Sequence, residues 1–385
     1  MELWKGLDSR YHFDDTDVDG SAVVFNGSMS EMGDIRYPRD FKDQSRPQVE
    51  FMTAQLQTSK IPIFIRPFKG NASDAEQYRD VLPDIFSMIR EGSWIIRDNG
   101  GVSSDILNSV MDSGNRYLTR VKMNLSDDKR ITENKDKWEY AEDGVCCIRH
   151  TFDSSGRTTY LFMSADNTIR SYHAAERSVK RMMDAARSYR EGKFRKSDFV
   201  TVKKNIAADI KVRVDVQTSF DLNESDTEGL IRKVMGPRAG IFKLESSVQL
   251  TPREALKKYR ARASAEHLIR LFKRVRGLKP LRVWKEQSIK GSMILALLSE
   301  TAVAMAGYEL ESEAVSRMDS GETAKENRHP SAESIVWSLG HLTLCRIVEE
   351  GKRKSSVYSN WNLISERIFA NIRSDLYINK VSAGG

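Results

Sequence analysis

The most informative stretch of this chain is Tyr259-Arg-Ala-Arg262-Ala-Ser-Ala-Glu266-His-Leu-Ile-Arg-Leu-Phe-Lys273. On a helix that turns by about 100° per residue, four of its polar residues fall within an arc of about 60°: Tyr259, Arg262, Glu266 and Lys273. Apolar residues gather on roughly the opposite side: Ala261, Leu268, Leu271, Phe272, Val275 and Leu278. The pattern predicts a helix that buries one face and presents a carboxylate in a row of groups able to bind phosphate.

An ordinary solvated helix would account for the same pattern. Arg262 and Glu266 stand four residues apart, a spacing at which an exposed ion pair contributes about 0.3 to 0.5 kcal/mol. Polar residues are also what any exposed helix face carries. The stripe alone therefore leaves two readings open, a functional row and a plain surface.

The spacing Tyr-x2-Arg-x3-Glu-x6-Lys resembles the signature of a large group of prokaryotic insertion-sequence transposases of the DDE type. All four positions match, and the segment from Arg276 to Trp284 resembles the segment that follows the signature in those proteins. The resemblance implies that Glu266 is the third catalytic carboxylate. It implies DNA contacts from a set of basic and aromatic residues, to which we add two neighbouring arginines: Tyr259, Arg262, Lys273, Arg270 and Arg276.

A second carboxylate is expected at Asp98. The run Trp94-Ile-Ile-Arg-Asp98 is typical of a buried strand, and it ends before a pair of glycines. In the transposase group the second catalytic Asp ends such a strand, usually as Asp-x-Gly, and Asp98-Asn99-Gly100 reproduces that pattern. The alternative is an Asp that only begins a turn, as Asp often does.

The first carboxylate is expected in the acidic run Phe13-Asp14-Asp15-Thr16-Asp17-Val-Asp19-Gly20. Members of the group commonly show an aromatic residue followed by Asp-x-Thr, so Asp14 fits, and Asp15, on the other strand face, stays open as a rival. We expect a turn at Asp19-Gly20 between two strands. A calcium loop starting at Asp15 is disfavoured, because its twelfth position holds Asn26 and not the required Glu.

The chemistry follows from the resemblance. It implies a DDE recombinase in which Asp14, Asp98 and Glu266 hold two Mg²⁺ or Mn²⁺ ions, and in which one site cuts transposon ends and joins them to target DNA. No covalent enzyme intermediate is needed, so Tyr259 would contact DNA and would not be a nucleophile. We expect a homodimer on DNA. Two alternatives remain: a ribonuclease H-like nuclease that cuts without joining, and a truncated, non-catalytic DNA-binding relative.

Composition agrees with an enzyme that binds a polyanion. Residues 250–290 carry thirteen Lys or Arg against three Glu, whereas residues 1–40 carry nine acids and four bases. Such a basic segment beside an acidic one suits DNA binding and cation binding respectively. The apolar run 293–306 is interrupted at 299–301, so no membrane span is expected. Three cysteines match no disulfide framework or zinc spacing, and we expect a cytoplasmic protein associated with the nucleoid through DNA.

The expected fold is α/β: a ribonuclease H-like mixed sheet with a β-rich insertion domain and a helical C-terminal region. Sheet strands are expected near residues 10, 22, 50, 63, 95 and 118, and a hairpin over 145–163. Helices are expected after the caps at 73 and 103–104. The expected division is 1–125 and 250–310 for the catalytic domain, 126–249 for the insertion, and 311–385 for the helical C-terminal region.

Overall fold

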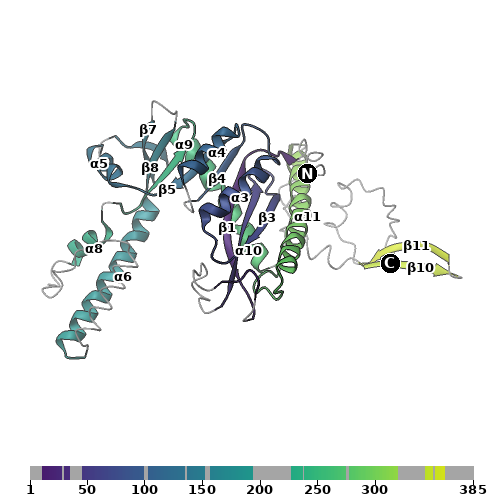
Figure 1. Cartoon of the computed structure of the whole chain (residues 1–385). Helices are drawn as coiled ribbons and strands as arrows, with labels where there is room; N and C mark the ends of the chain where they lie inside the picture. Colours follow the sequence, from purple (N-terminus) through teal and green to yellow (C-terminus); the bar gives the residue numbers. More distant parts are fainter. Residues whose placement is uncertain are drawn as a thin grey trace. The chain divides into compact units, whose positions relative to one another are not determined.

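The computed structural model describes residues 11–27, 30–34, 46–98, 103–134, 137–151, 157–193, 227–236, 238–274, 277–319, 343–349 and 352–359. The chain divides into two compact units. Unit 1 comprises Met1–Ile96, Gly100–Asn115 and Ala261–Gly385, and unit 2 comprises Arg97–Asn99 and Arg116–Arg260. The unit boundaries at Arg116 and Arg260 lie close to, but outside, the expected insertion limits of 126 and 249. Figure 1 shows the elements of both units.

Unit 1 contains a strand layer in the order β3-β2-β1-β4. The strands are β1 (Thr16–Val24), β2 (Gln48–Leu56), β3 (Pro62–Phe68) and β4 (Trp94–Arg97). β1 pairs antiparallel with β2 from Thr16↔Leu56 to Val24↔Gln48, without interruption. The turn expected at Asp19-Gly20 is therefore wrong, because both residues pair within this register. Residues 1–10, where another strand was expected, lie outside the described residues.

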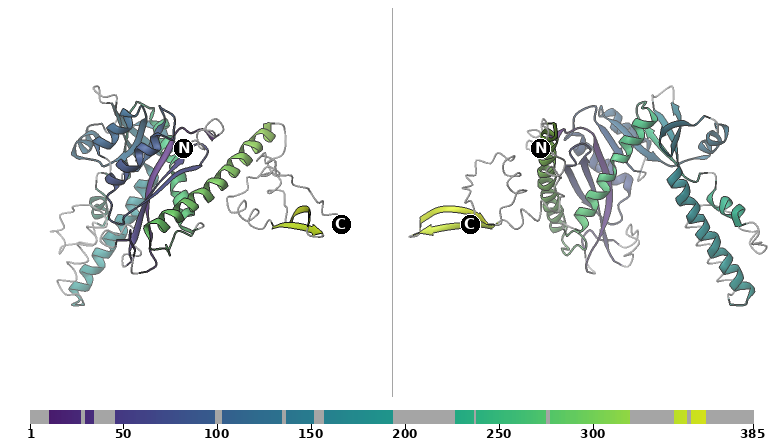
Figure 2. Two further views of the ribbon diagram at one scale, coloured as in Figure 1. Left: turned by 45° about the vertical axis from the view of Figure 1, so that its right-hand side comes forward. Right: turned by 180° about the vertical axis from the view of Figure 1, so that it is seen from behind.

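Successive side chains of β1 point to opposite faces of the strand layer, and a helix lies on each face. On one side, the Tyr78 hydroxyl of α3 (Asp74–Phe86) donates to the backbone oxygen of Val18. On the other side, Val23 joins a core cluster with residues of α10 (Ala263–Arg274). The front view of Figure 1 and the rear view of Figure 2 show α3 and α10 on opposite sides of the strands. Asp17 and Asp19 share the register of Val23 and so face α10.

The serines predicted as helix caps at 73 and 103 occupy the N-cap positions of their helices. Ser73 is the N-cap of α3 and accepts a hydrogen bond from the backbone N–H of Glu76. This bond satisfies one of the N–H groups that a helix start leaves unpaired. Ser103 precedes α4 (Ser104–Asp112) in extended conformation, without a side-chain cap bond.

Helix α11 (Glu286–Asp319) packs against β3 and carries part of the same core. Its residues Ile289 and Met293 are fully buried, and the Thr301 hydroxyl donates to the backbone oxygen of Pro62. Between Glu286 and Glu309 it is long and apolar enough to cross a membrane by length and composition alone, with a mean hydropathy of 1.4. A core helix passes the same test, and one face of α11 lies in the core of unit 1.

Unit 2 is built on strands in the order β5-β9-β8-β7-β6. They are β5 (Arg116–Val121), β6 (Glu139–Glu142), β7 (Val145–Thr151), β8 (Thr158–Ser164) and β9 (Ile241–Ser246). The expected hairpin is confirmed, since β7 pairs antiparallel with β8 from Val145↔Ser164 to Thr151↔Thr158.

Among the described residues of unit 2, the helices are α5 (Leu125–Glu133), α6 (Ala165–Arg190), α8 (Thr227–Met235) and α9 (Pro252–Ala261). Helix α8 packs on α6 through a small apolar cluster that includes Val179 and Ile231, and Figure 1 shows α6 as the longest element of this unit. Helix α6 begins at Ala165, directly after the last residue of β8.

The C-terminal part corrects one expectation. The predicted region of helices over 311–385 contains the end of α11 and then a two-stranded antiparallel pair, β10 (Thr343–Glu349) and β11 (Lys352–Ser359). Isoleucine, valine, threonine and tyrosine in these segments favour strands over helices. The other residues of this region lie outside the described ranges.

Candidate functional site

The helix expected through the Tyr259 stretch is two helices. Helix α9 ends at Ala261, Arg262 lies in a turn, and α10 begins at Ala263. The turn is closed by a hydrogen bond from the backbone N–H of Ala265 to the backbone oxygen of Arg262, at 2.8 Å. The expectation of one helix with a single polar stripe is therefore wrong, because the angular register cannot continue through the turn.

Arg262 is the residue that organises this turn. Its side chain is 9% exposed, so it belongs to the interior and not to a solvated face. Its Nη1 donates to Oδ2 of Asp19 at 3.3 Å, and its Nη2 donates to Oε1 of Glu266 at 3.0 Å. One guanidinium thus joins a carboxylate of β1 to a carboxylate in the first turn of α10.

The two carboxylates differ in their access to solvent. The Asp19 side chain is 18% exposed, and the Glu266 side chain is 59% exposed. The other Asp19 oxygen, Oδ1, accepts from the backbone N–H of Gly20 at 2.9 Å, which fixes the carboxylate on its strand. The paired acids therefore stand at the edge of the buried layer, one anchored on a strand and one reaching solvent.

A third carboxylate lies beneath this pair. Asp17 is fully buried on the same face of β1 as Asp19, and its oxygens accept from the side chains of Gln57 at 3.0 Å and Ser264 at 3.4 Å. Burial raises the pKa of Asp17 to about 7, and the neighbouring Lys60, Gln57 and Arg262 oppose that rise. The Ser264 contact ties the start of α10 to β1 two residues before Glu266.

Asp98 stands in unit 2 with a different partner. It follows the last residue of β4 and is half-buried. Its Oδ1 accepts a hydrogen bond from the hydroxyl of Tyr259 at 3.1 Å. Two residues of the predicted site, one at a strand end and one on α9, therefore meet within unit 2.

Asp14 and Asp15 lie before β1, not on it. An oxygen of Asp15 accepts from the backbone N–H of Trp94 at 3.0 Å, so this carboxylate holds the start of β4. Burial, followed by the neighbouring Asp15 charge, raises the pKa of Asp14. Within the described residues, Asp14 makes no hydrogen bond or ion pair with Glu266 or Arg262, whereas Asp19 accepts one from Arg262.

The remaining predicted DNA contacts lie along α10 and beyond it. Arg270 is exposed and Lys273 is half-buried on α10. Arg276 lies outside the described residues. Arg270 and Lys273 therefore lie on α10, whereas Tyr259 lies on α9, before the turn at Arg262.

The sequence matches a known protein family. The family model described as the transposase DDE domain matches residues 13–299, which is most of the chain. The chain belongs to the DDE transposase family. A search of curated proteins finds no match.

Among solved structures, this DDE transposase chain is similar to a piggyBac transposase in a synaptic complex with hairpin DNA. The TM-score is 0.43 and the sequence identity is 9%, over 78% of this chain and 48% of that one. The chain thus spans about half the length of that structure.

Divalent metal ions are general in this transposase family. The donors of unit 1 fit such an ion in kind, since carboxylate oxygens are the ligands that Mg²⁺ and Mn²⁺ prefer. Asp19 and Glu266 already bind a common cationic group, the Arg262 guanidinium. Within the described ranges, no three side chains of His, Cys, Asp or Glu gather closely enough to hold a metal ion.

Asp19 is the residue that sequence reasoning missed in this transposase. Considered alone, Asp19-Gly20 favours a turn, and Asp19 also fits a position of the disfavoured calcium loop. The available signal was the two-residue alternation Asp17, Asp19, Ser21, Val23, which continues the polar-to-apolar face of one strand. This alternation places the side chains of Asp17, Asp19 and Val23 on one face of β1, toward the same helix.

Proposed function

We propose that this chain cuts DNA at transposon ends and joins the cut strands to target DNA through Asp19, Asp98 and Glu266. The family assignment supports DNA phosphoryl transfer in general. The choice of Glu266 and Asp98 rests on the sequence resemblance, and the choice of Asp19 over Asp14 rests on the contacts of β1. Two metal ions and a homodimer on DNA stay predictions of the resemblance.

One observation carries the choice of Asp19. In unit 1 a single buried guanidinium binds both Asp19 and Glu266, although the two acids are far apart in the sequence. Burying charged groups is costly unless they are paired, so a fold that gathers them at one point needs a compensating cation. Asp14 lies outside β1 and has no such link to Glu266.

Each residue has a role that its surroundings support. When bound, a divalent ion held by these carboxylates would act as a Lewis acid on the phosphate being cut. The backbone N–H of Gly20 and the guanidinium of Arg262 orient Asp19, while Ser264 and Asp17 hold the start of α10 that carries Glu266. The Tyr259 hydroxyl donates a hydrogen bond to the Asp98 carboxylate, a geometry that suits a positioning contact and not an attacking nucleophile.

The test is metal-dependent cleavage and strand transfer. The substrate is a duplex carrying the inverted repeats that flank the gene, with Mg²⁺ or Mn²⁺ added to metal-free protein. We expect the wild-type chain to nick and join this duplex, and Asp98→Asn and Glu266→Gln each to abolish both reactions while binding the duplex as before. Exposed Glu76→Gln on α3 is the matched control and should retain activity.

Other outcomes separate the alternatives. Cleavage without joining would favour a ribonuclease H-like nuclease. Duplex binding without any cleavage, at every metal concentration, would favour a non-catalytic relative and contradict the proposal.

A further inference from the structure

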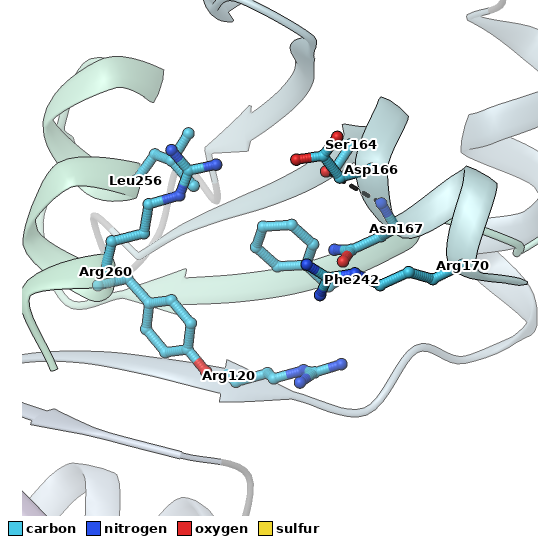
Figure 3. Close-up of a pocket in the computed structure, with 9 residues that line it drawn as sticks. Arg120, Ser164, Asp166, Asn167, Arg170, Phe242, Leu256 and Arg260 are labelled. Atoms are coloured by element: carbon cyan, nitrogen blue, oxygen red, sulfur yellow. Dashed lines mark hydrogen bonds between the residues drawn. The ribbon is translucent and has the colours of Figure 1, made fainter. Parts of the chain in front are cut away.

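Unit 2 contains a pocket that the carboxylate site does not include. Its volume is about 290 Å³, and it opens to solvent between β5, β9, the start of α6 and α9. Figure 3 shows the pocket with its lining side chains. The lining residues are Arg120, Ser164, Asp166, Asn167, Arg170, Phe242, Leu256, Tyr259 and Arg260.

The pocket is cationic. Three guanidinium groups line it, from β5, α6 and α9, against a single lining carboxylate, that of Asp166. Arg260 is already paired with Glu142. For Arg120 and Arg170 no hydrogen bond or ion pair of the side chain is recorded within the described residues, and both are exposed. Two guanidinium groups on separate elements are therefore available to an anion.

Tyr259 connects this pocket to Asp98. Its side chain lines the pocket, and its hydroxyl donates to the Asp98 carboxylate, all within unit 2. An anion held by Arg120 and Arg170 would thus lie near a carboxylate proposed for cleavage. The position suits a phosphate of the same DNA strand that is being cut, because consecutive phosphates of one strand are only several ångströms apart.

We propose that Arg120 and Arg170 bind a DNA backbone phosphate in this pocket, next to the phosphate at Asp98. The proposal rests on the proposed function and deepens it by naming a second DNA contact, distant in sequence from the Tyr259 stretch. Arginine suits this task because its planar group can give two parallel hydrogen bonds to phosphate oxygens. An exposed pocket also admits a continuous strand, which a closed cavity would not.

The experiment measures duplex affinity against salt. Each phosphate contact that releases a counterion contributes about 0.9 to the slope of log affinity against log salt. We expect Arg120→Gln and Arg170→Gln each to make the slope shallower by about 0.9, and the double variant by about 1.8. The probe is the duplex with the flanking inverted repeats. Arg79→Gln, an exposed arginine of α3, is the matched control and should leave the slope unchanged.

A competition experiment separates DNA phosphate from a small anion. Inorganic phosphate and pyrophosphate are titrated against wild type and the double variant at constant ionic strength. Binding of these ions to the wild type alone, with equal DNA slopes in both proteins, would assign the pocket to a small anion and overturn the proposal. Circular dichroism confirms that the variants are folded, which their exposed positions favour.

The salt slope is measured without cleavage, so failure of the pocket proposal and failure of the proposed function can be told apart. If Asp98→Asn abolishes cleavage while the double variant keeps the wild-type salt slope, the pocket proposal fails and the proposed function stands. If the wild type neither cuts the duplex nor binds it in a salt-dependent way, both proposals fail. A shallower slope in the double variant, with the control unchanged, supports the pocket whether or not strand joining is detected.

Discussion

The two units meet in the sequence between Arg260 and Ala261, and their charged residues lie in opposite kinds of surroundings. In unit 1, Asp17, Asp19 and Glu266 gather around one buried guanidinium. In unit 2, the pocket beside Tyr259 gathers exposed guanidinium groups around one carboxylate. Two arginines only two positions apart, Arg260 and Arg262, therefore sit in different surroundings, one on a surface and one in an interior.

The two proposals give this difference a physical reason: carboxylates for chemistry in unit 1 and arginines for phosphate binding in unit 2. Burying several acids around one cation carries a desolvation penalty, and a catalytic site needs the fixed geometry that such burial gives. Exposed arginines carry little desolvation penalty and can attract and position a polyanion.

The largest effect on stability is expected at Arg262. Arg262→Gln should lower the free energy of unfolding by about 2 to 3 kcal/mol, because it leaves the Asp19 and Glu266 carboxylates without their shared cation. The figure is below that of a fully buried pair, since Glu266 is 59% exposed. Urea unfolding of wild type and variant measures the change.

Arg260→Gln is the matched control for that experiment. Its side chain is 51% exposed and its pair with Glu142 lies at the surface, so we expect a loss of at most about 1 kcal/mol. Equal losses in the two variants would remove the contrast between the units.

A smaller effect is expected in the pH dependence of stability, through Asp17. Its pKa rises from an ordinary value of 3.8 to about 7 because the carboxyl is buried. Between these values the folded chain binds more protons than the unfolded chain, so this group makes stability fall as pH rises, by up to about 1.4 kcal/mol per pH unit. Asp17→Asn should remove that contribution and flatten the curve in metal-free buffer.

The control for Asp17→Asn is Asp112→Asn, which alters an exposed side chain at the end of α4. It should leave the pH dependence of the free energy of unfolding as in the wild type. If Asp17→Asn also leaves the curve unchanged between about pH 4 and pH 7, Asp17 titrates as an ordinary carboxyl and the interior of unit 1 is more polar than its contacts indicate.

The parts of the fold that sequence could predict depend on local signals. Strand β4 with Asp98 at its end follows from an apolar run beside glycines, the cap at Ser73 from its spacing to Glu76, and the β7–β8 hairpin from two strand-like runs around a polar turn. Each signal lies within a few residues, so no distant contact was needed to find it.

The break at Arg262 could not be predicted in this way. Its flanking residues, Ala261 and Ala263, are strong helix formers, so local propensity favours an unbroken helix. The Arg262 side chain is instead fixed by Asp19, more than 240 residues earlier in the chain. Asp19 could not be selected from the sequence for a similar reason. Asp-Gly on its own predicts a turn, and the contact of Asp19 with Arg262 joins residues far apart in the sequence.

The direct test of the proposed Asp19 carboxylate compares two variants of one acidic segment, Asp19→Asn and Asp14→Asn, in metal-dependent cleavage of the duplex that carries the flanking inverted repeats. We expect Asp19→Asn to abolish cleavage while retaining duplex binding, and Asp14→Asn to cut at close to the wild-type rate. Cleavage by Asp19→Asn together with an inactive, folded Asp14→Asn would contradict the assignment of Asp19 and return the first carboxylate to Asp14.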